Sequence, residues 1–154
     1  MKFRDDLIVK DALPLFFENY HFKDGGGYND AYFKIKIGNF YLPVPNIEAR
    51  KQGAKLHDIH HILTEIEATW FGEVKIGVWE LYIGCKKSWP AWLLNSGAVI
   101  IGFFLYQKAI KEGYQLAKQT QTNLYHLTIP YDELLKMTVG ELRTIVFKNH
   151  TNTA

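Results

Sequence analysis

Eighteen consecutive residues, from Trp89 to Tyr106, carry no formal charge, and this run limits the possible folds more than any other feature of the chain. Its length is close to the minimum for a membrane-spanning helix. However, it contains Pro90, Asn95, Ser96 and two glycines, which lower its tendency to insert into a bilayer. Proline suits the first turn of a helix, so we expect a buried helix here. The alternatives are the wall or lip of a lipid-binding cavity and a membrane span.

The overall composition is that of a folded domain. The chain has 154 residues, of which 47% are hydrophobic and 22% charged, and this argues against disorder. A chain of this length can bury a real core. We expect a single domain over residues 1–154, mainly α, as a compact helical domain with a small N-terminal β-hairpin. Its metal- and lipid-binding helical core would span about residues 43–147.

The β-hairpin is predicted from alternating apolar and polar residues between Ala31 and Leu42. The turn is expected at Gly38-Asn39. Pro43 and Pro45 are expected to end the second strand, because proline cannot donate a hydrogen bond within a sheet.

Helical patterns occupy most of the remaining chain. The expected segments are residues 3–21, interrupted near Pro14; 48 or 54 to 68; 73–83, closed by Gly84; 91–117, with breaks at Gly97, Gly102 and Gly113; and a last region that begins near Tyr131 and contains a capping box at Thr138-x-x-Glu141.

The most informative functional motif is His57-Asp58-Ile59-His60-His61, followed by Glu73 after eleven intervening residues. Residues four apart on a helix are offset by only about 40° and about one turn of rise, so His57 and His61 can bind one divalent ion without strain. Gly72 is expected to break the chain and to turn Glu73 back toward the pair. Two imidazoles and a carboxylate suit zinc and other transition metals.

The remaining polar residues of this region have several readings. Asp58 lies about 100° around the helix from His57, so it binds the ion only if the helix start is distorted and otherwise accepts a hydrogen bond from a ligand. Glu65 is the main rival of Glu73 as a ligand. Glu80 is a candidate partner of the site or base for a metal-bound water, although we favour a surface or interface carboxylate. His60 is expected beside the site or in solvent.

Ordinary structural roles would also explain these residues. Histidines four apart are often a solvated or hydrogen-bonded helix face, and Glu73 could be a favourable acidic residue at a helix start. Large aromatic residues are expected mainly in the core, with cavity lining as the alternative; they are Trp79, Trp92, Phe103 and Phe104.

The run His57-Asp58-x-x-His61 with its distant Glu73 resembles the signature of the coenzyme Q biosynthesis protein 4 family. The resemblance covers roughly residues 43–147. Other stretches similar to the family are Ile62-Leu63-Thr64, Gly72-Glu73, Trp79-Glu80-Leu81, Gly84-Cys85, Trp92-Leu93-Leu94-Asn95, Pro130-Tyr131-Asp132-Glu133-Leu134-Leu135 and Glu141-Leu142-Arg143.

The resemblance implies a function in ubiquinone biosynthesis. Family members act on or hold a polyprenylated benzoate-type precursor, and an oxidative decarboxylation is attributed to them. The implied metal ligands are His57, Asp58, His61 and Glu73, with Asp58 and Glu80 as candidate catalytic residues. The ion would be Zn²⁺ first, with Mg²⁺, Mn²⁺ or Fe²⁺ as alternatives. The implied partners are a prenylated lipid or quinone precursor, a second copy in a homodimer, a membrane surface and other enzymes of the pathway.

A second function stays open beside the enzyme. It is a non-catalytic carrier of a prenyl lipid or isoprenoid phosphate, in which the metal clamps the polar head. A His-Asp phosphohydrolase is disfavoured because the chain lacks a clear upstream histidine and downstream aspartate for such a site. A zinc peptidase is disfavoured because Asp58 stands where a glutamate base is expected.

Charge and cysteine content restrict the setting of the protein. The net charge is +2 without a basic run, so nucleic acid is not an expected partner. Cys85 is the single cysteine, which excludes an intramolecular disulfide. The start Met1-Lys2-Phe3-Arg4-Asp5-Asp6 lacks the apolar core of a signal peptide. We expect a cytoplasmic protein, either free or peripheral at the inner face of the membrane.

Overall fold

The computed structural model describes residues 1–22, 27–37, 40–85 and 88–148. The described part is mainly helical with one antiparallel hairpin, which confirms the predicted fold class. In chain order the elements are α1 (Val9–Asn19), β1 (Tyr32–Ile37), β2 (Phe40–Pro45), α2 (Glu48–Thr64), α3 (Trp70–Ile83), α4 (Trp89–Leu105), α5 (Gln107–Lys118), the 3-10 turn η2 (Leu124–His126), α6 (Tyr131–Leu134) and α7 (Val139–Val146).

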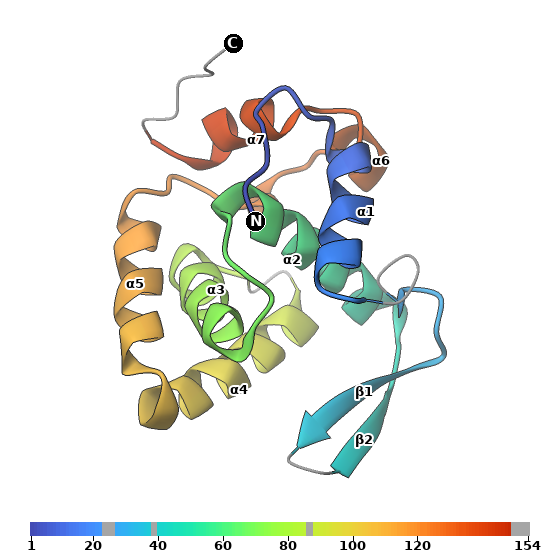
Figure 1. The fold of residues 1–154 in the computed structure, drawn as a ribbon, viewed down its shortest axis with the longest axis vertical. Coiled ribbons are helices and arrows are strands. Elements are labelled where there is room, and N and C mark those ends of the chain that lie inside the picture. Colours follow the sequence, from blue (N-terminus) through green and yellow to red (C-terminus); the bar gives the residue numbers. More distant parts are fainter. Residues whose placement is uncertain (23–26, 38–39, 86–87, 149–154) are drawn as a thin grey trace.

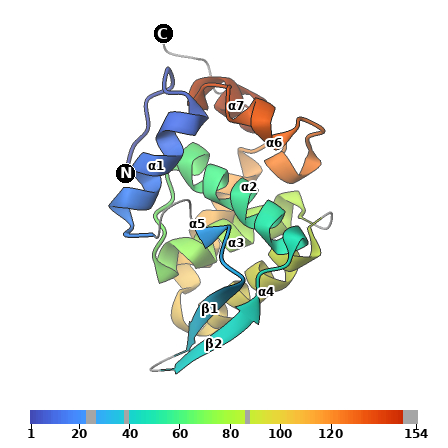
Figure 2. The same ribbon diagram turned by 90° about the vertical axis from the view of Figure 1, so that its right-hand side faces the viewer.

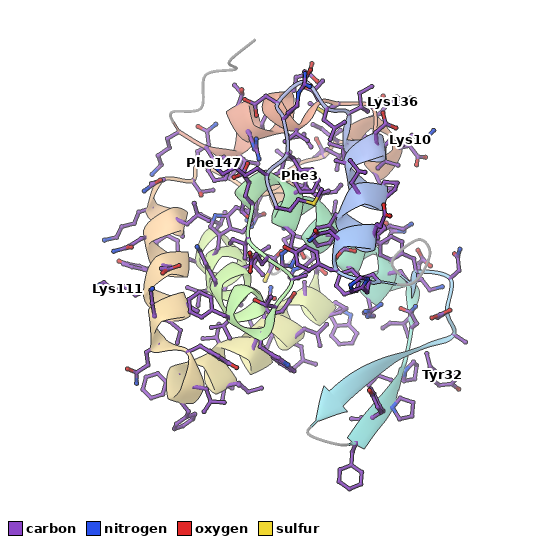
Figure 3. All side chains as sticks on the ribbon, in the orientation of Figure 1. Phe3, Lys10, Tyr32, Lys111, Lys136 and Phe147 are labelled. Carbon is purple, nitrogen blue, oxygen red and sulfur yellow. The ribbon has the colours of Figure 1, made fainter. Side chains whose placement is uncertain are left out.

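Helix α2 connects the two halves of the helical body. On one side α3 packs against both α4 and α5, and α2 contacts α4; on the other side α2 contacts α1 and α7 (Figure 1). The hairpin projects from the body at the end opposite α7 (Figures 1 and 2). Tyr32 on the hairpin and Lys111 on α5 point away from the body (Figure 3). The predicted ligands His57 and His61 lie on α2 and Glu73 lies on α3, so they belong to the two helices that contact most of the helical body.

The main core joins side chains from both halves. Its members include Phe16 of α1, Ile62 of α2, Trp79 of α3 and Leu142 of α7, all at most 1% exposed. The hydrophobic core thus includes α1 as well as the later helices. An isolated bridge between Ile8 and Thr138 ties the segment before α1 to the start of α7.

Arg143 fixes the end of α2. Glu65 follows the helix in the left-handed conformation, with φ 56°, so α2 ends at Thr64 and the expected continuation to Ala68 is wrong. The guanidinium of Arg143 donates to the last carbonyls, those of Ile62 and Leu63, at 3.3 and 3.1 Å. These carbonyls have no partner inside the helix, and the cation satisfies them.

Three glycines that were expected to break helices instead allow close packing. A Cβ on Gly72 would lie 1.7 Å from the Glu67 carbonyl oxygen, and one on Gly102 would lie 2.3 Å from Val74. A Cβ on Gly113 would lie 2.3 Å from the Lys75 carbonyl oxygen. Gly72 and Gly102 are therefore interior positions of α3 and α4, and Gly113 is an interior position of α5.

The uncharged helix α4 ends at Leu105, because the next residue, Tyr106, leaves the helical conformation, and not because of a glycine. Tyr106 has φ −135° and ψ 47°, which separates α4 from α5. Gly97 lies within α4 without a break, and no atom lies within 4 Å of the place where its Cβ would be. The backbone at this position therefore borders open space.

Pro14 and Pro43 do not end the elements that contain them. Helix α1 begins at Val9 and continues through Pro14. Strand β2 continues through Pro43, opposite Lys34, and ends at Pro45, opposite Tyr32, so the expected strand end is right for Pro45 and wrong for Pro43. Each strand of a two-stranded sheet has one open edge, where the missing N–H of proline costs no ladder hydrogen bond. The predicted turn at residues 38–39 lies outside the described residues.

Helix α4 is not the buried helix that we expected. Only Pro90, Ala91, Asn95 and Gly102 are buried along it. The core prediction is right for Trp79, with no exposed surface, and wrong for Trp92, Phe103 and Phe104, which are 47%, 63% and 74% exposed. Among the described residues, no helix combines the length and apolar character needed to cross a membrane.

Replacing Arg143 by methionine should destabilise the protein. The guanidinium contacts Asp5 at 2.8 Å and Glu65 at 2.9 Å as well as the end of α2, so its loss leaves several groups without their main partner. We expect the free energy of unfolding in urea to fall by about 3 kcal/mol. The control is Lys136→Met at an exposed ion pair, which should leave the free energy of unfolding close to that of the wild type. Equal effects of the two variants would contradict this role of Arg143.

Candidate metal centre

Two helices supply the three residues of the candidate metal centre. His57 and His61 lie one turn apart on α2, and Glu73 lies in the first turn of α3. Thr69 caps α3, because its side-chain oxygen accepts the N–H of Gly72 at 3.2 Å. The capped first turn of α3 thus holds Glu73 beside α2.

Three of the four predicted ligands, all except Asp58, lie close together. The Nε2 atoms of His57 and His61 are 3.1 Å apart. Glu73 Oε2 lies 3.2 Å from His57 Nε2, and Glu73 Oε1 lies 3.2 Å from His61 Nε2. Within the described residues, these are the His, Cys, Asp and Glu side chains grouped closely enough to hold an ion.

Both imidazoles are oriented through their second nitrogen. His61 Nδ1 lies 2.9 Å from the carbonyl oxygen of Ile66, which can only accept, so Nδ1 carries the proton. His57 Nδ1 lies 3.0 Å from Glu80 Oε1, a carboxylate that accepts in the same way. In the neutral form of each ring, Nε2 is therefore the nitrogen with the lone pair, and it lies beside Glu73. Ligand histidines in metal proteins are commonly oriented by such partners.

Glu80 is a buried partner of the site rather than the surface carboxylate that we favoured. Its side chain has no exposed surface. Oε1 lies 3.0 Å from His57 Nδ1 and 2.6 Å from His60 Nδ1. Oε2 accepts a hydrogen bond from Asn95 and lies 3.4 Å from the Tyr125 hydroxyl. Because these four groups surround it, Glu80 lies behind His57 and not at the ligand atoms.

His60 belongs to the same network. Its Nε2 accepts the backbone N–H of Leu124 at 3.0 Å, so the ring proton is on Nδ1 and is donated to Glu80. The side chain is fully buried. Of the two readings of His60, the place beside the site is therefore correct and the solvent-facing one is wrong.

Asp58 lies beside the centre, outside the group of three ligands. Its carboxylate accepts a hydrogen bond from the hydroxyl of Tyr28, and it lines the same cavity as His57 and Glu73. This position agrees with the helical geometry, which turns Asp58 about 100° away from His57. Asp58 is thus a hydrogen-bond acceptor beside the site, but the donor is Tyr28 and not one of the three grouped residues.

Glu65, the rival ligand, is directed away from the centre. The left-handed conformation at the end of α2 carries its carboxylate to Arg143, at 2.9 Å. Glu65 was a candidate because it lies four residues after His61, a spacing that shares a face only within a helix. Helix α2 ends at Thr64, one residue before Glu65. Glu73 is the carboxylate that meets both histidines.

Burial and charge fix the protonation of the network. Burial alone would raise the pKa of Glu73, but the neighbouring His61 and His57 lower it well below its usual range. The same balance, dominated by His57, lowers the pKa of Glu80. Burial lowers the pKa of His57, yet the carboxylates of Glu80 and Glu73 outweigh it and raise that pKa. Without metal, His57 therefore keeps a proton where an ion would bind.

Asp58 is shifted in the opposite direction from the other two carboxylates. Burial raises its pKa, and the nearby His57, Tyr28 and His61 offset only part of that effect. The hydroxyl of Tyr28 also has a raised pKa, through burial and the charge of Asp58. This pair can therefore hold a proton at the edge of the site.

The ligand set fits a transition-metal ion. Zinc–nitrogen bonds of about 2.0–2.1 Å place tetrahedral ligand atoms roughly 3.3 Å from one another, close to the observed 3.1 and 3.2 Å. Two histidines and one glutamate are a catalytic zinc set that keeps a fourth position open, and a facial triad of this type also binds Fe²⁺. An ion here would polarise a carboxylate or phosphate oxygen at its open position.

A cavity of about 520 Å³ extends from the centre along α4. Its polar end holds His57, Asp58, Glu73 and Arg50. The walls are mainly apolar, with Trp70 of α3 and several residues of α4: Leu93, Leu94, Gly97, Ala98 and Ile101. The lip-of-cavity reading of the uncharged stretch therefore describes α4 better than the buried-helix reading.

Sequence reasoning missed four side chains that complete the site. Tyr28 and Asn95 contact the carboxylates of Asp58 and Glu80, and Tyr125 lies near Glu80. Arg50 lies two turns before His57 and donates to the Asn46 side chain at 2.9 Å. Only Asn95 had a visible signal, as a polar residue inside an apolar stretch; Tyr28 and Tyr125 come from distant segments with no spacing pattern.

Comparisons of the chain with models of protein families, with curated proteins and with solved structures found no match. The resemblance to the coenzyme Q biosynthesis protein 4 family therefore stays a prediction.

The stability of the metal-free protein should fall as the pH rises above neutrality. The pKa of His57 is raised over its unfolded value of about 6.5. Its contribution is thus complete below about pH 6.5 and is lost as the pH rises through the folded pKa. Urea unfolding between pH 6.5 and 8, with a chelator present, measures this decrease. The interval stops at pH 8 because burial raises the pKa of Cys85 to about 11, which adds a second alkaline effect.

The variant His57→Gln is the matched comparison for this pH effect. It should lack the decrease that the wild type shows between pH 6.5 and 8. With excess zinc the sign reverses, because the ion displaces the proton and its apparent affinity rises with pH. Identical pH profiles of the metal-free wild type and His57→Gln would contradict the assignment.

Proposed function

We propose that this protein binds a divalent transition-metal ion, with zinc as the first candidate, through His57, His61 and Glu73. The observation that carries the proposal is the convergence of three ligand atoms within 4.8 Å of one another. The orientation of both histidines through their Nδ1 atoms supports it further, because it presents Nε2 of each ring to Glu73, as in the histidine ligands of metal proteins.

We further propose that the ion holds the acidic head of an amphipathic ligand. The cavity joins a polar end, with the ligand set and Arg50, to the apolar wall of α4. A carboxylate or phosphate at the ion would place an apolar chain along Gly97 and its neighbours. A polyprenylated benzoate-type precursor of ubiquinone, which the family resemblance implies, has this form.

For an enzyme of this type, the bound ion would act as a Lewis acid on the carboxylate of the substrate. Asp58 is the described carboxyl group at the edge of the cavity whose raised pKa suits proton transfer. Glu80 would act through His57, by holding its Nδ1 proton, and not as the base itself. The resemblance favours decarboxylation.

The alternative is a carrier that holds the ligand without turnover. Its support is the engagement of the two candidate catalytic carboxylates: Asp58 already accepts from Tyr28, and Glu80 is enclosed by His57, His60 and Asn95. Such a protein would still need the metal to bind the head group.

Peripheral membrane association is also part of the proposal. Exposed apolar residues cover the outer face of α4 and the hairpin, which lie toward the same end of the molecule (Figures 1 and 2). The most exposed of them are Phe40 at 81%, Phe104 at 74% and Leu105 at 69%. Phenylalanine and leucine are typical of the apolar face of segments that lie in the bilayer interface. The alternative is that a second copy of the chain binds this surface in a homodimer.

Metal content tests the first step of the proposal. Purified wild-type protein should hold one divalent ion per chain, measured by inductively coupled plasma mass spectrometry after gel filtration. His61→Ala should lose most of it, because it removes one of three ligands. The control is His126→Ala at an exposed histidine on η2, which should retain the wild-type content. Equal metal content in His61→Ala and the wild type would rule out the centre.

Filling the cavity at Gly97 tests the lipid part of the proposal. A Cβ at this position meets no other part of the protein within 4 Å, and Gly97 lines the cavity, so the side chain of Gly97→Leu has open space to enter. The change also improves helix propensity by up to about 1 kcal/mol. Lipid extraction and mass spectrometry should find the co-purified lipid of the wild type depleted in this variant, at unchanged metal content. Full retention of the lipid would contradict a ligand that lies along α4.

Liposome flotation tests the membrane surface. Phe104→Ser on α4 should weaken binding to anionic vesicles at least about tenfold, since burial of one aromatic side chain contributes about 1.5–3 kcal/mol. Tyr82→Ser, at an exposed aromatic residue of α3, is the control. If Phe104→Ser instead dissociates a dimer and leaves flotation unchanged, α4 is covered by a second copy.

A further inference from the structure

Asn95 is an unusual buried polar residue. It is 5% exposed on α4, whose other described positions are almost all apolar or small. A buried amide costs free energy unless it is hydrogen-bonded. Asn95 Nδ2 donates to Glu80 Oε2 and has a weak second contact, at 4.0 Å, with the sulfur of Cys85. Its main partner is therefore the carboxylate behind His57.

The two oxygens of Glu80 have separate tasks. Oε1 accepts from both imidazoles, at 3.0 Å from His57 and 2.6 Å from His60. Oε2 has Asn95 and the more distant Tyr125 hydroxyl, at 3.4 Å. Without the Asn95 amide, the buried Oε2 keeps only the long contact. Without that donor nothing nearby among the described residues fixes the orientation of the carboxylate, and its rotation removes the fixed acceptor of His57 Nδ1.

Helix α4 carries Asn95 to this position by close packing on α3. A Cβ on Gly77 would lie 3.5 Å from the Asn95 carbonyl oxygen and 3.6 Å from its Cα, so the two helices are in direct contact there. Glu80 follows Gly77 by one turn of α3. Leu94 beside Asn95, and Ala98 one turn later, line the ligand cavity. The same stretch of α4 thus contacts both the ligand space and the carboxylate that orients His57.

We propose that Asn95 is a positioning residue of the metal centre, which acts on His57 through Glu80 and makes metal affinity depend on the seating of α4. The inference rests on the proposed function, because it requires that His57 bind a metal. It assigns to α4 a second task beside that of forming the apolar wall. By linkage, a ligand that tightens the contact of α4 with α3 would also strengthen metal binding.

The test measures the affinity for Co²⁺ or Zn²⁺ in Asn95→Leu. Leucine has a similar shape and no donor, and we expect a 10- to 100-fold weaker metal affinity by competition with a chelating dye. The absorption spectrum of the Co²⁺ form should also change, because His57 loses its fixed orientation. Ser96→Ala, at the next position, is the matched control and should stay within twofold of the wild type. Tyr125→Phe should have a smaller effect than Asn95→Leu, since its contact is longer.

The outcomes separate this inference from the proposed function. A wild-type protein that binds neither metal contradicts the proposed function itself. A folded Asn95→Leu variant with wild-type affinity and an unchanged Co²⁺ spectrum contradicts only the role of Asn95. If circular dichroism shows that Asn95→Leu does not fold, Asn95→Ala is measured in its place, and the same loss of affinity is expected. A purely structural role of Asn95 would lower stability and leave both metal readouts unchanged.

Discussion

The geometry of the candidate metal centre depends on the hydrogen bonds of one buried carboxylate, that of Glu80. The carboxylate joins α3, which carries it, to His57 and His60 of α2 and to Asn95 of α4, with the Tyr125 hydroxyl nearby. A buried charge is tolerated only when its hydrogen bonds are satisfied, so these elements must keep one arrangement. The same arrangement fixes the tautomer of His57 and leaves its Nε2 for an ion. Packing and metal chemistry therefore share one constraint.

The end of α2 adds a second fixed point on the other side of the centre. Arg143 holds the last carbonyls of α2 and draws Glu65 away, which allows the chain to turn into α3. Ile66, in that turn, accepts from His61 Nδ1. The turn also brings Glu73 to both histidines. The centre thus lies between a buried anion and a buried cation, each of which ties α2 to another part of the chain.

The sequence predicted the parts of the site that depend on local spacing. His57 and His61 share a helix face because they lie four residues apart, and the capping box at Thr138 was visible for the same reason. Failures came from tertiary contacts. Gly72, Gly102 and Gly113 were read as breaks because the neighbours that require a small residue lie elsewhere in the chain. Asn95 and Tyr28 could not be assigned, since their partners are on other elements.

The apolar residues of α4 illustrate the same limit. A run of residues without charge predicts an apolar helix. It does not show whether that helix lies in the core, lines a cavity or forms an exposed face. The structure separates these roles along one helix: Asn95 and Gly102 contact α3, Gly97 borders the cavity, and Phe104 is exposed. The packing of α2, α3 and α5 against α4 decides which residue has which role.

Anomalous diffraction from crystals grown with zinc tests the central claim most directly, because it locates the ion without reference to activity or lipid. The account predicts a peak at the zinc edge about 2.0–2.2 Å from Nε2 of His57, Nε2 of His61 and a carboxylate oxygen of Glu73. The Nδ1 atom of His57 should remain hydrogen-bonded to Glu80. A peak bound only by other residues, or no peak at saturating zinc with these three side chains in their present places, would contradict it.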